Sequence, residues 1–196
     1  MTRLHRIFSV LLLGLTLVLA TACARQVGFH ASYAAMSFDE RLARAEAIFT
    51  GTVMEVSATR WNQDSGDYWQ DVDAQGEQVR QALPFYTVTL ALRETLAGAL
   101  ADKFVTVTIL GVSPRAAGFD SAERPLQVGD DAVILARQTE LTWRDGSRLV
   151  WYLLGDPSES YLVKSADGLY RLPGAVEGLT QAALTAQIAQ QRAETR

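Results

Sequence analysis

The alternation of apolar and polar residues predicts a chain built mainly of short β-strands. The segments 84–93 and 103–110 alternate residue by residue, so that threonines fall on one face and valines, leucines or isoleucines on the other. Gly51 lies inside an apolar, β-branched segment and predicts a bulge or a sharp bend there. The strands predicted in this way cover residues 47–56, 84–93, 103–110, 132–137, 148–154, 161–164 and 169–172.

Two helices are predicted at the ends of this series. Ser37 and Glu40 have the spacing of a capping box, so a short helix is expected through residue 46, with Phe38, Leu42 and Ala45 on one face. A second helix is expected over residues 177–192. Six or seven strands without βαβ alternation, with one helix before and one after, indicate a mainly β fold and a small antiparallel OB-like barrel.

The first 23 residues have the pattern of an export signal. Arg3 and Arg6 precede an apolar run from residue 7 to residue 20, and small residues then lead to Cys23, the single cysteine of the chain. The run is short for a permanent membrane span, which needs about 20 apolar residues. The expected organisation is a signal peptide over 1–22, an anchor and tether over 23–36, and one β-barrel domain over 37–192.

This leader resembles the lipobox signal of bacterial lipoproteins. The resemblance implies that the Cys23 thiol receives a diacylglycerol, that the chain is cut before Cys23, and that acyl chains such as palmitate hold the protein on a membrane. Because residue 24 is alanine and not aspartate, it also implies the periplasmic face of the outer membrane in a diderm cell, and otherwise the outer face of the cell membrane. The alternative is an ordinary signal peptide that contains a cysteine.

Charge narrows the range of partners. The formal net charge is −4, with 18 basic and 22 acidic residues. Loss of Arg3 and Arg6 with the leader leaves 16 basic residues and a charge of −6. No cluster of lysine and arginine follows, which argues against nucleic acid as a partner and against a polybasic membrane patch. A single cysteine cannot form a disulfide within the chain.

Four segments in a fixed order carry a second resemblance: AEAIFTGTV (45–53), PFYTVTLALRETLAG (84–98), FVTVTILG (104–111) and LQVGDDAVILA (126–136). Over residues 38–172 the chain is similar to a broad group of uncharacterised bacterial secreted proteins with an OB-like barrel of the netrin and tissue-inhibitor type. The resemblance implies a fold more than an activity. Metalloprotease inhibitors of that shape chelate zinc through a free N-terminal cysteine amine, and an acylated Cys23 cannot do this.

The sequence offers no catalytic, metal or cofactor site of a standard type. The one histidine after the leader, His30, lies in the tether, so a histidine-based triad or a zinc site is not expected. Asp64, Asp67, Asp71 and Asp73 favour a solvated acidic loop over a Ca²⁺ site, because the spacing of a calcium loop is missing. Carboxylates paired in a cleft, as in glycosidases, stay open as an alternative.

The segment 60–82 is the best candidate for contact with a partner. It is polar but contains Trp61, Tyr68 and Trp69, and aromatic faces on a loop suit stacking on sugars or docking of a protein. The alternative is that these rings fold down over one end of the barrel, while Trp143 and Trp151 pack at its core or rim. We therefore expect a lipid-anchored cell-envelope module that binds or scaffolds a protein or polysaccharide. A hydrolase of envelope polymers and a purely structural protein are the alternatives.

Overall fold

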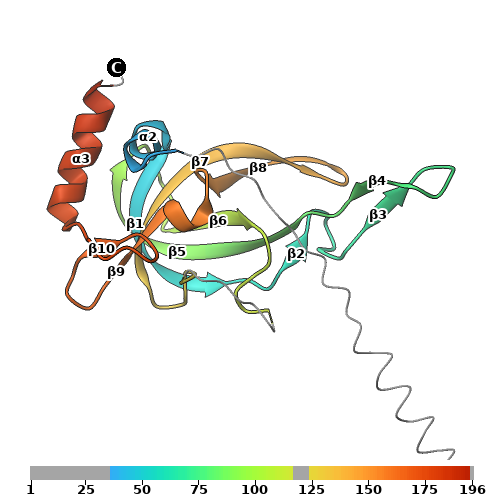
Figure 1. The fold of residues 1–196 in the computed structure, drawn as a ribbon, viewed down its shortest axis with the longest axis horizontal. Helices are drawn as coiled ribbons and strands as arrows, with labels where there is room; N and C mark the ends of the chain where they lie inside the picture. Colours follow the sequence, from blue (N-terminus) through green and yellow to red (C-terminus); the bar gives the residue numbers. More distant parts are fainter. Residues whose placement is uncertain (1–35, 117–123, 195–196) are drawn as a thin grey trace, which may run out of the picture.

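A computed structural model describes residues 36–116 and 124–194 (Figure 1). Cys23, His30 and the leader lie outside these residues. The described elements are α2 (Phe38–Arg44), β1 (Ala47–Val56), β2 (Arg60–Trp61), β3 (Gln70–Val72), β4 (Gln78–Gln81), β5 (Pro84–Ala97), β6 (Phe104–Leu110), β7 (Asp131–Trp143), β8 (Gly146–Leu153), η1 (Pro157–Glu159), β9 (Tyr161–Lys164), β10 (Tyr170–Arg171) and α3 (Gln181–Glu194). The mainly β fold with a helix at each end is confirmed.

Five strands form a partly closed ring in the order β1-β5-β6-β8-β7, and β7 returns to β1. Four of the five pairings are antiparallel and extensive. The fifth, between β6 and β8, is parallel and has two registered pairs, Val107 with Trp151 and Thr108 with Tyr152. The sequence predicted an antiparallel barrel, but the ring contains one parallel junction. This junction, between β6 and β8, has the fewest registered pairs of the five.

Strand β1 pairs with two neighbours and is irregular along one of them. It lies between β5 and β7, and its register with β5 shifts between Thr50 and Gly51. A side chain at Gly51 would place its Cβ 2.8 Å from the carbonyl oxygen of Ala91, so the close approach of the two backbones requires glycine. The predicted irregularity at Gly51 is confirmed.

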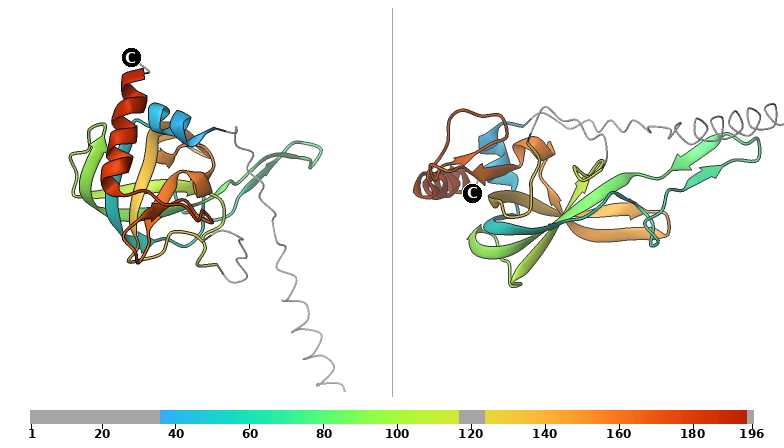
Figure 2. Two further views of the ribbon diagram at one scale, coloured as in Figure 1. Left: turned by 60° about the vertical axis from the view of Figure 1, so that its left-hand side comes forward. Right: turned by 90° about the horizontal axis from the view of Figure 1, so that it is seen from below.

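Two apolar clusters lie on opposite faces of the ring's wall. Alternate residues of β7 supply both: Ala132, Ile134 and Ala136 belong to the interior cluster, and Val133 and Leu135 belong to the cluster beneath the helices. The period of two along a strand separates these sets. The second cluster also contains Leu42 of α2 and Leu184 and Ile188 of α3, so the helices cover one outer face of the ring (Figure 2).

The helix at each end forms for the reasons that the sequence indicates. The Ser37 hydroxyl accepts a hydrogen bond from the Glu40 amide, and the Glu40 carboxylate accepts one from the Ser37 amide, which completes the predicted capping box. Helix α2 spans Phe38–Arg44 and so ends earlier than expected. Helix α3 begins at Gln181, after a turn region, and buries the predicted Leu184 and Ile188.

Two hairpins extend from the ring on one side of the molecule (Figures 1 and 2). Strand β7 continues to Trp143, six residues beyond the predicted end at residue 137, because β8 pairs with it over its whole outer half. The segment 60–82, expected as a loop, contains β2 and the separate β3–β4 hairpin. Within the described residues no helix is long and apolar enough to cross a membrane.

Candidate functional site

The three aromatic residues predicted in the segment 60–82 have different environments. Trp61 is half-buried and Tyr68 is exposed, and their rings meet edge to face with centroids 5.1 Å apart. The Tyr68 hydroxyl lies 3.3 Å from the side-chain oxygen of Gln70. These two rings form an aromatic pair on the surface of the segment, where an approaching molecule can reach them.

Trp69 is buried, with 5% of its surface exposed. The guanidinium groups of Arg80 and Arg144 each lie 5.3 Å from its ring centroid. Asp71 forms ion pairs with both arginines, at 4.0 Å and 3.0 Å. The ring of Trp69 therefore packs within the protein, which favours for this residue the alternative that the aromatic rings of the segment fold down. Asp71 keeps the two arginine side chains in place beside the ring.

Asn62 joins the segment to the β7–β8 hairpin. Its buried side chain donates to the carbonyl oxygen of Thr142 at 3.0 Å and accepts from Trp69 Nε1 at 3.2 Å and from the Leu83 amide at 2.7 Å. Its own carbonyl accepts from the Arg144 amide. A buried amide with this many partners fixes the position of the chain around it, so the base of the segment is held rigidly against the end of β7.

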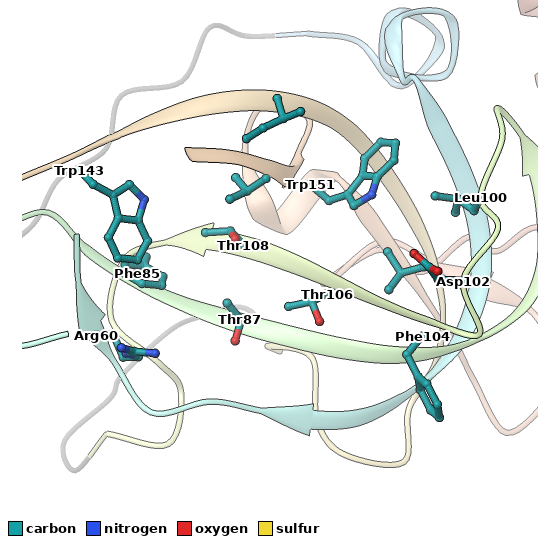
Figure 3. A pocket seen from close by; sticks show the side chains of 13 residues that line it. Arg60, Phe85, Thr87, Leu100, Asp102, Phe104, Thr106, Thr108, Trp143 and Trp151 are labelled. Carbon is teal, nitrogen blue, oxygen red and sulfur yellow. The ribbon is translucent and has the colours of Figure 1, made fainter. Parts of the chain in front are cut away.

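A groove of about 450 Å³ lies beside this docked segment (Figure 3). Such a volume lies within the range of ligand sites in proteins. The groove runs over the outer face of β5 and β6 and is bounded by β8, the end of β7 and the β5–β6 connection. Its lining residues are Arg60, Phe85, Thr87, Leu100, Asp102, Phe104, Val105, Thr106, Thr108, Trp143, Leu149, Val150 and Trp151.

The floor of the groove carries threonine hydroxyls. Thr87 and Thr108 are cross-strand partners on β5 and β6, as are Thr89 and Thr106, whose hydroxyl oxygens lie 3.1 Å apart. The alternation predicted for both strands therefore puts the threonines on the outer face and the valines in the core. This floor offers short polar groups that can donate or accept.

The rim of the groove is apolar. Phe104 and Leu149 expose 59% and 63% of their surface, on β6 and β8. Trp151 is half-buried and packs against the interior cluster. Trp143 is less accessible, because its ring packs against Phe85 at 5.2 Å and the Arg148 guanidinium lies 4.6 Å from its centroid. Exposed side chains of this size beside a hollow are typical of a contact surface.

The two ends of the groove carry opposite charges. Arg60 pairs in register with Phe85, which is itself opposite Leu110 at the end of β6. Asp102 precedes the start of β6 at Phe104, and Figure 3 shows it at the other end from Arg60. A guanidinium nitrogen of Arg60 donates a hydrogen bond to the main-chain carbonyl oxygen of Asp64 at 3.1 Å. This bond holds the Arg60 side chain at its end of the groove.

Asp64, Asp71 and Asp73 of the segment make contacts that support the structure. Asp64 pairs with Arg148, and Asp73 accepts hydrogen bonds from the amides of Gln75 and Glu77. In the described chain, no three histidine, cysteine, aspartate or glutamate side chains gather as metal ligands would. Elsewhere in the described chain, the Asp130 carboxylate accepts a hydrogen bond from the Gln127 amide in a turn, and the Asp131 carboxylate contacts Thr52 and Arg93.

Perturbed carboxyl groups lie away from the groove. The amide of Ser37 lowers the pKa of Glu40 in the capping box. The Arg171 side chain, helped by the Leu169 amide, lowers the pKa of Asp167 to about 2. In both cases hydrogen bonds stabilise the charged form of the carboxyl group and so lower its pKa. These carboxyl groups belong to a helix cap and a turn, and their shifts do not indicate a catalytic site.

The sequence prediction missed Phe104, Leu149 and the charged ends of the groove. A signal for Phe104 was present, because it shares the outer face of β6 with Thr106 and Thr108, and a large aromatic residue on a polar face indicates contact. Leu149 carried no comparable signal, since its segment is apolar almost throughout.

No family model matches the chain, and a search among curated proteins finds no match.

Proposed function

We propose that this protein is a lipid-anchored binding module of the cell envelope and that the groove over β5 and β6 is its ligand site. The observation that carries the proposal is the groove itself, a hollow with exposed Phe104 and Leu149 on its rim and threonines on its floor. The segment 60–82 contributes to this site by supplying Arg60. The aromatic pair of Trp61 and Tyr68 forms a second contact surface on the same segment.

An OB-like barrel is the fold that we infer for the ring. Its support is the strand order β1-β5-β6-β8-β7 with closure onto β1 and a parallel junction between β6 and β8. In OB-folds, ligands bind on the face of the second and third strands, between the loops that flank it. Here the second and third strands of the ring are β5 and β6, and the flanking connections are the segment 57–83 and the β7–β8 turn.

Binding accounts for the groove better than hydrolysis does. Acid–base hydrolysis of a glycan uses two carboxyl groups that flank the scissile bond. Among the described residues that line the groove, Asp102 is the one carboxylate. In the 60–82 segment, Asp64 and Asp71 pair with arginines and Asp73 holds a turn, as described above.

Attachment to a membrane through Cys23 completes the proposal. Its support is the leader, with two arginines, an apolar run and small residues before the single cysteine. Two or more acyl chains give stable anchoring where one chain gives reversible binding. Mass spectrometry of membrane-extracted protein tests this part: the expected mature N-terminus is acylated Cys23, and any other mature N-terminus contradicts it.

The ligand site is tested with a matched pair of double variants in the full-length protein. Phe104→Ser with Leu149→Ser removes the apolar rim, and Val128→Ser with Val176→Ser changes apolar side chains that are exposed away from the groove and the 60–82 segment, at 63% and 89%. The protein is captured from native membranes with its bound partners after crosslinking. We expect the rim variant to lose the partners and the control to keep them, because a few side chains of an interface carry most of its binding energy.

Equal capture by the two double variants would contradict the assignment of the groove. A third variant, Trp61→Ala with Tyr68→Ala, then measures the aromatic pair alone. Trp69 is not suitable for this purpose, because it is buried between Arg80 and Arg144 and its truncation would disturb the docked segment. Unfolding midpoints of all variants are compared first, so that a loss of capture is read from folded protein.

A further inference from the structure

We propose that the groove binds a neutral, β-linked polysaccharide, whose sugar rings pack against the apolar rim and whose hydroxyl groups meet the threonine floor. This inference rests on the proposed function, since it names the chemical class of the ligand for the same site. It follows from the side chains that line the groove, from their charges and from the two kinds of surface that a β-linked sugar ring offers.

The main chain of β6 contributes little to the site, because β5 takes one edge of the strand and β8 takes part of the other. Strand β5 pairs with β6 from Phe104 to Leu110. Strand β8 pairs with it in parallel at Val107 and Thr108. Since the bonds of a parallel pair are slanted, this pairing engages the Thr106 carbonyl and the Thr108 main chain. Recognition in the groove therefore depends on its side chains.

The threonine floor presents hydroxyl groups and no charge. Thr87, Thr106 and Thr108 line the groove, and Thr106 is the most exposed of the three. A threonine hydroxyl can donate one hydrogen bond and accept two, and the hydroxyl groups of a sugar have the same capacity. An acyl chain in the groove would instead leave the threonine hydroxyls without partners, at a cost in free energy. The floor therefore favours a ligand that is rich in hydroxyl groups.

The apolar rim fits the faces of a sugar ring. In a β-linked pyranose chain the C–H groups lie on the flat faces of each ring and the hydroxyl groups lie around its edge. Phe104 exposes 59% of its surface and meets no other aromatic ring among the described residues, so a sugar face can stack on it. Phe104 and Thr106 lie on the same face of β6, two residues apart. A sugar ring on Phe104 thus has its hydroxyl groups beside the floor.

The charges of the groove favour a neutral ligand. Among the described residues that line it, Arg60 is the one cation and Asp102 is the one carboxylate, so the two charges cancel. Both side chains are exposed, and neither forms an ion pair with another described residue. Each can therefore bond to hydroxyl groups of a sugar. Because the whole chain has a net charge of −4, a ligand with an acidic group on every unit would be repelled.

The end of the groove at Arg60 also contains a donor that the protein does not satisfy. Trp143 Nε1 is buried and has no hydrogen-bond partner among the described residues. Figure 3 shows Trp143 at the same end of the groove as Arg60. A buried N–H without a partner costs free energy, and a sugar oxygen can satisfy it once the side chains that cover the nitrogen move aside.

Isothermal titration calorimetry of the full-length protein tests the class of ligand. The protein is held in micelles of a detergent without a sugar headgroup and is titrated with chitohexaose, cellohexaose and maltohexaose. We expect at least one of the β-linked hexasaccharides, chitohexaose or cellohexaose, to bind. The α-linked maltohexaose should bind at least about tenfold more weakly, because its coiled chain presents fewer flat faces for stacking. No binding of either β-linked hexasaccharide, or equal binding of maltohexaose, overturns the inference.

A matched pair of double variants shows whether the floor recognises hydroxyl groups. Thr87→Val with Thr106→Val removes two hydroxyls from the groove and keeps the shape of the side chains. Thr139→Val with Thr142→Val makes the same change on β7, at positions that do not line the groove. We expect the floor variant to lose about tenfold in affinity for the hexasaccharide, since two hydrogen bonds are removed, and the control to bind as the wild type does. Equal affinities of the two variants overturn the proposed recognition.

Capture from native membranes separates this inference from the proposed function. The wild type, the rim variant Phe104→Ser/Leu149→Ser and the control Val128→Ser/Val176→Ser are compared after crosslinking. The captured material is digested with proteinase K and its sugars are measured by chromatography after acid hydrolysis. We expect neutral sugars with the wild type and the control but not with the rim variant.

The other outcomes of this capture are distinct. If the rim variant loses captured protein that carries no sugar, the polysaccharide ligand is overturned and the binding site stands. If the rim variant captures the same material as the wild type does, the proposed function itself fails.

Discussion

The two sides of the ring differ in what covers them. On the helix-covered side, where β1 lies between β5 and β7, the wall of the ring is buried on both faces. On the groove side, where β6 meets β8, the inner face is buried but the outer face carries exposed Phe104 and Leu149. Strands β5 and β7 contribute to both sides, to the cluster beneath the helices and to the lining of the groove.

This difference separates stability from binding. The helix-covered side has a second apolar cluster beneath the helices in addition to the interior cluster, so both faces of its wall contribute apolar burial. The groove side has only two registered pairs at the junction of β6 with β8, and its rim side chains are exposed. A site built there can exchange partners without disturbing the core, and the comparison predicts where substitutions change stability and where they change binding.

Truncation of an equally sized apolar side chain on each side gives the largest contrast. Ile48 is fully buried between β1 and the helices, whereas Leu149 is 63% exposed. Ile48→Ala should lower the free energy of unfolding by about 2–5 kcal/mol, and Leu149→Ala should change it by about 0.5 kcal/mol or less. Urea unfolding followed by circular dichroism measures both.

The comparison fails if the two variants have similar midpoints. A large loss for Leu149→Ala would mean that the groove side supports the fold, and the rim variants used to test binding would then need smaller substitutions. A change in the slope of the urea transition would instead report a change in the compactness of the unfolded or native state.

Two glycines with nearly the same φ test whether the helix-covered side is packed more tightly than an exposed hairpin. Gly98 (φ 83°) follows β5 on the helix-covered side, and a Cβ there would strike the carbonyl oxygen of Glu46. Gly76 (φ 82°) lies in the turn of the β3–β4 hairpin, with open space around it. Alanine at either site adopts a left-handed conformation at a cost of about 1–2 kcal/mol.

Gly98→Ala adds a backbone collision to this conformational cost and should lose at least about 1 kcal/mol more than Gly76→Ala. Thermal and urea unfolding of both variants give the difference directly. Equal losses would mean that the contact between residue 98 and β1 relaxes easily, so the helix-covered side would be more adaptable than its packing indicates.

The parts of the fold that could be predicted are those that depend on local pattern. Alternation places the strands around Thr87 and Thr106, the Ser37–Glu40 spacing gives the first helix, and Gly51 marks the irregularity in β1. In each case the residues within one element contain the information. The second helix begins later than expected because its start depends on the preceding turn.

The parts that could not be predicted depend on contacts between distant segments. Trp69 is buried because Arg144, 75 positions later, packs on it, and Asn62 bonds to Thr142 across 80 positions. Strand β7 is long because β8 continues to pair with it. The groove needs the placement of four strands, so no local pattern could show that Asp102 and Arg60 lie at its ends.

The smallest predicted effect concerns an exposed ion pair in the turn between β9 and β10, on the helix-covered side. Hydrogen bonds from Arg171 at 2.8 Å and 2.7 Å lower the pKa of Asp167 to about 2 from its ordinary 3.8. A carboxyl group with a lowered folded pKa contributes stability above its unfolded pKa, and loses this contribution as the pH falls through the folded value. The contribution should therefore disappear between about pH 4 and pH 2.

Asp167→Asn removes this dependence, so the difference in unfolding midpoint between variant and wild type should be present at pH 7 and should vanish near pH 2. Arg171→Gln should give the same pH profile, and the double variant should add little, because both changes remove one interaction. The effect is small since the pair is exposed to solvent. A difference that persists at pH 2 would show that Asp167 acts through the shape of the turn, by its hydrogen bond from the Leu169 amide, and not through its charge.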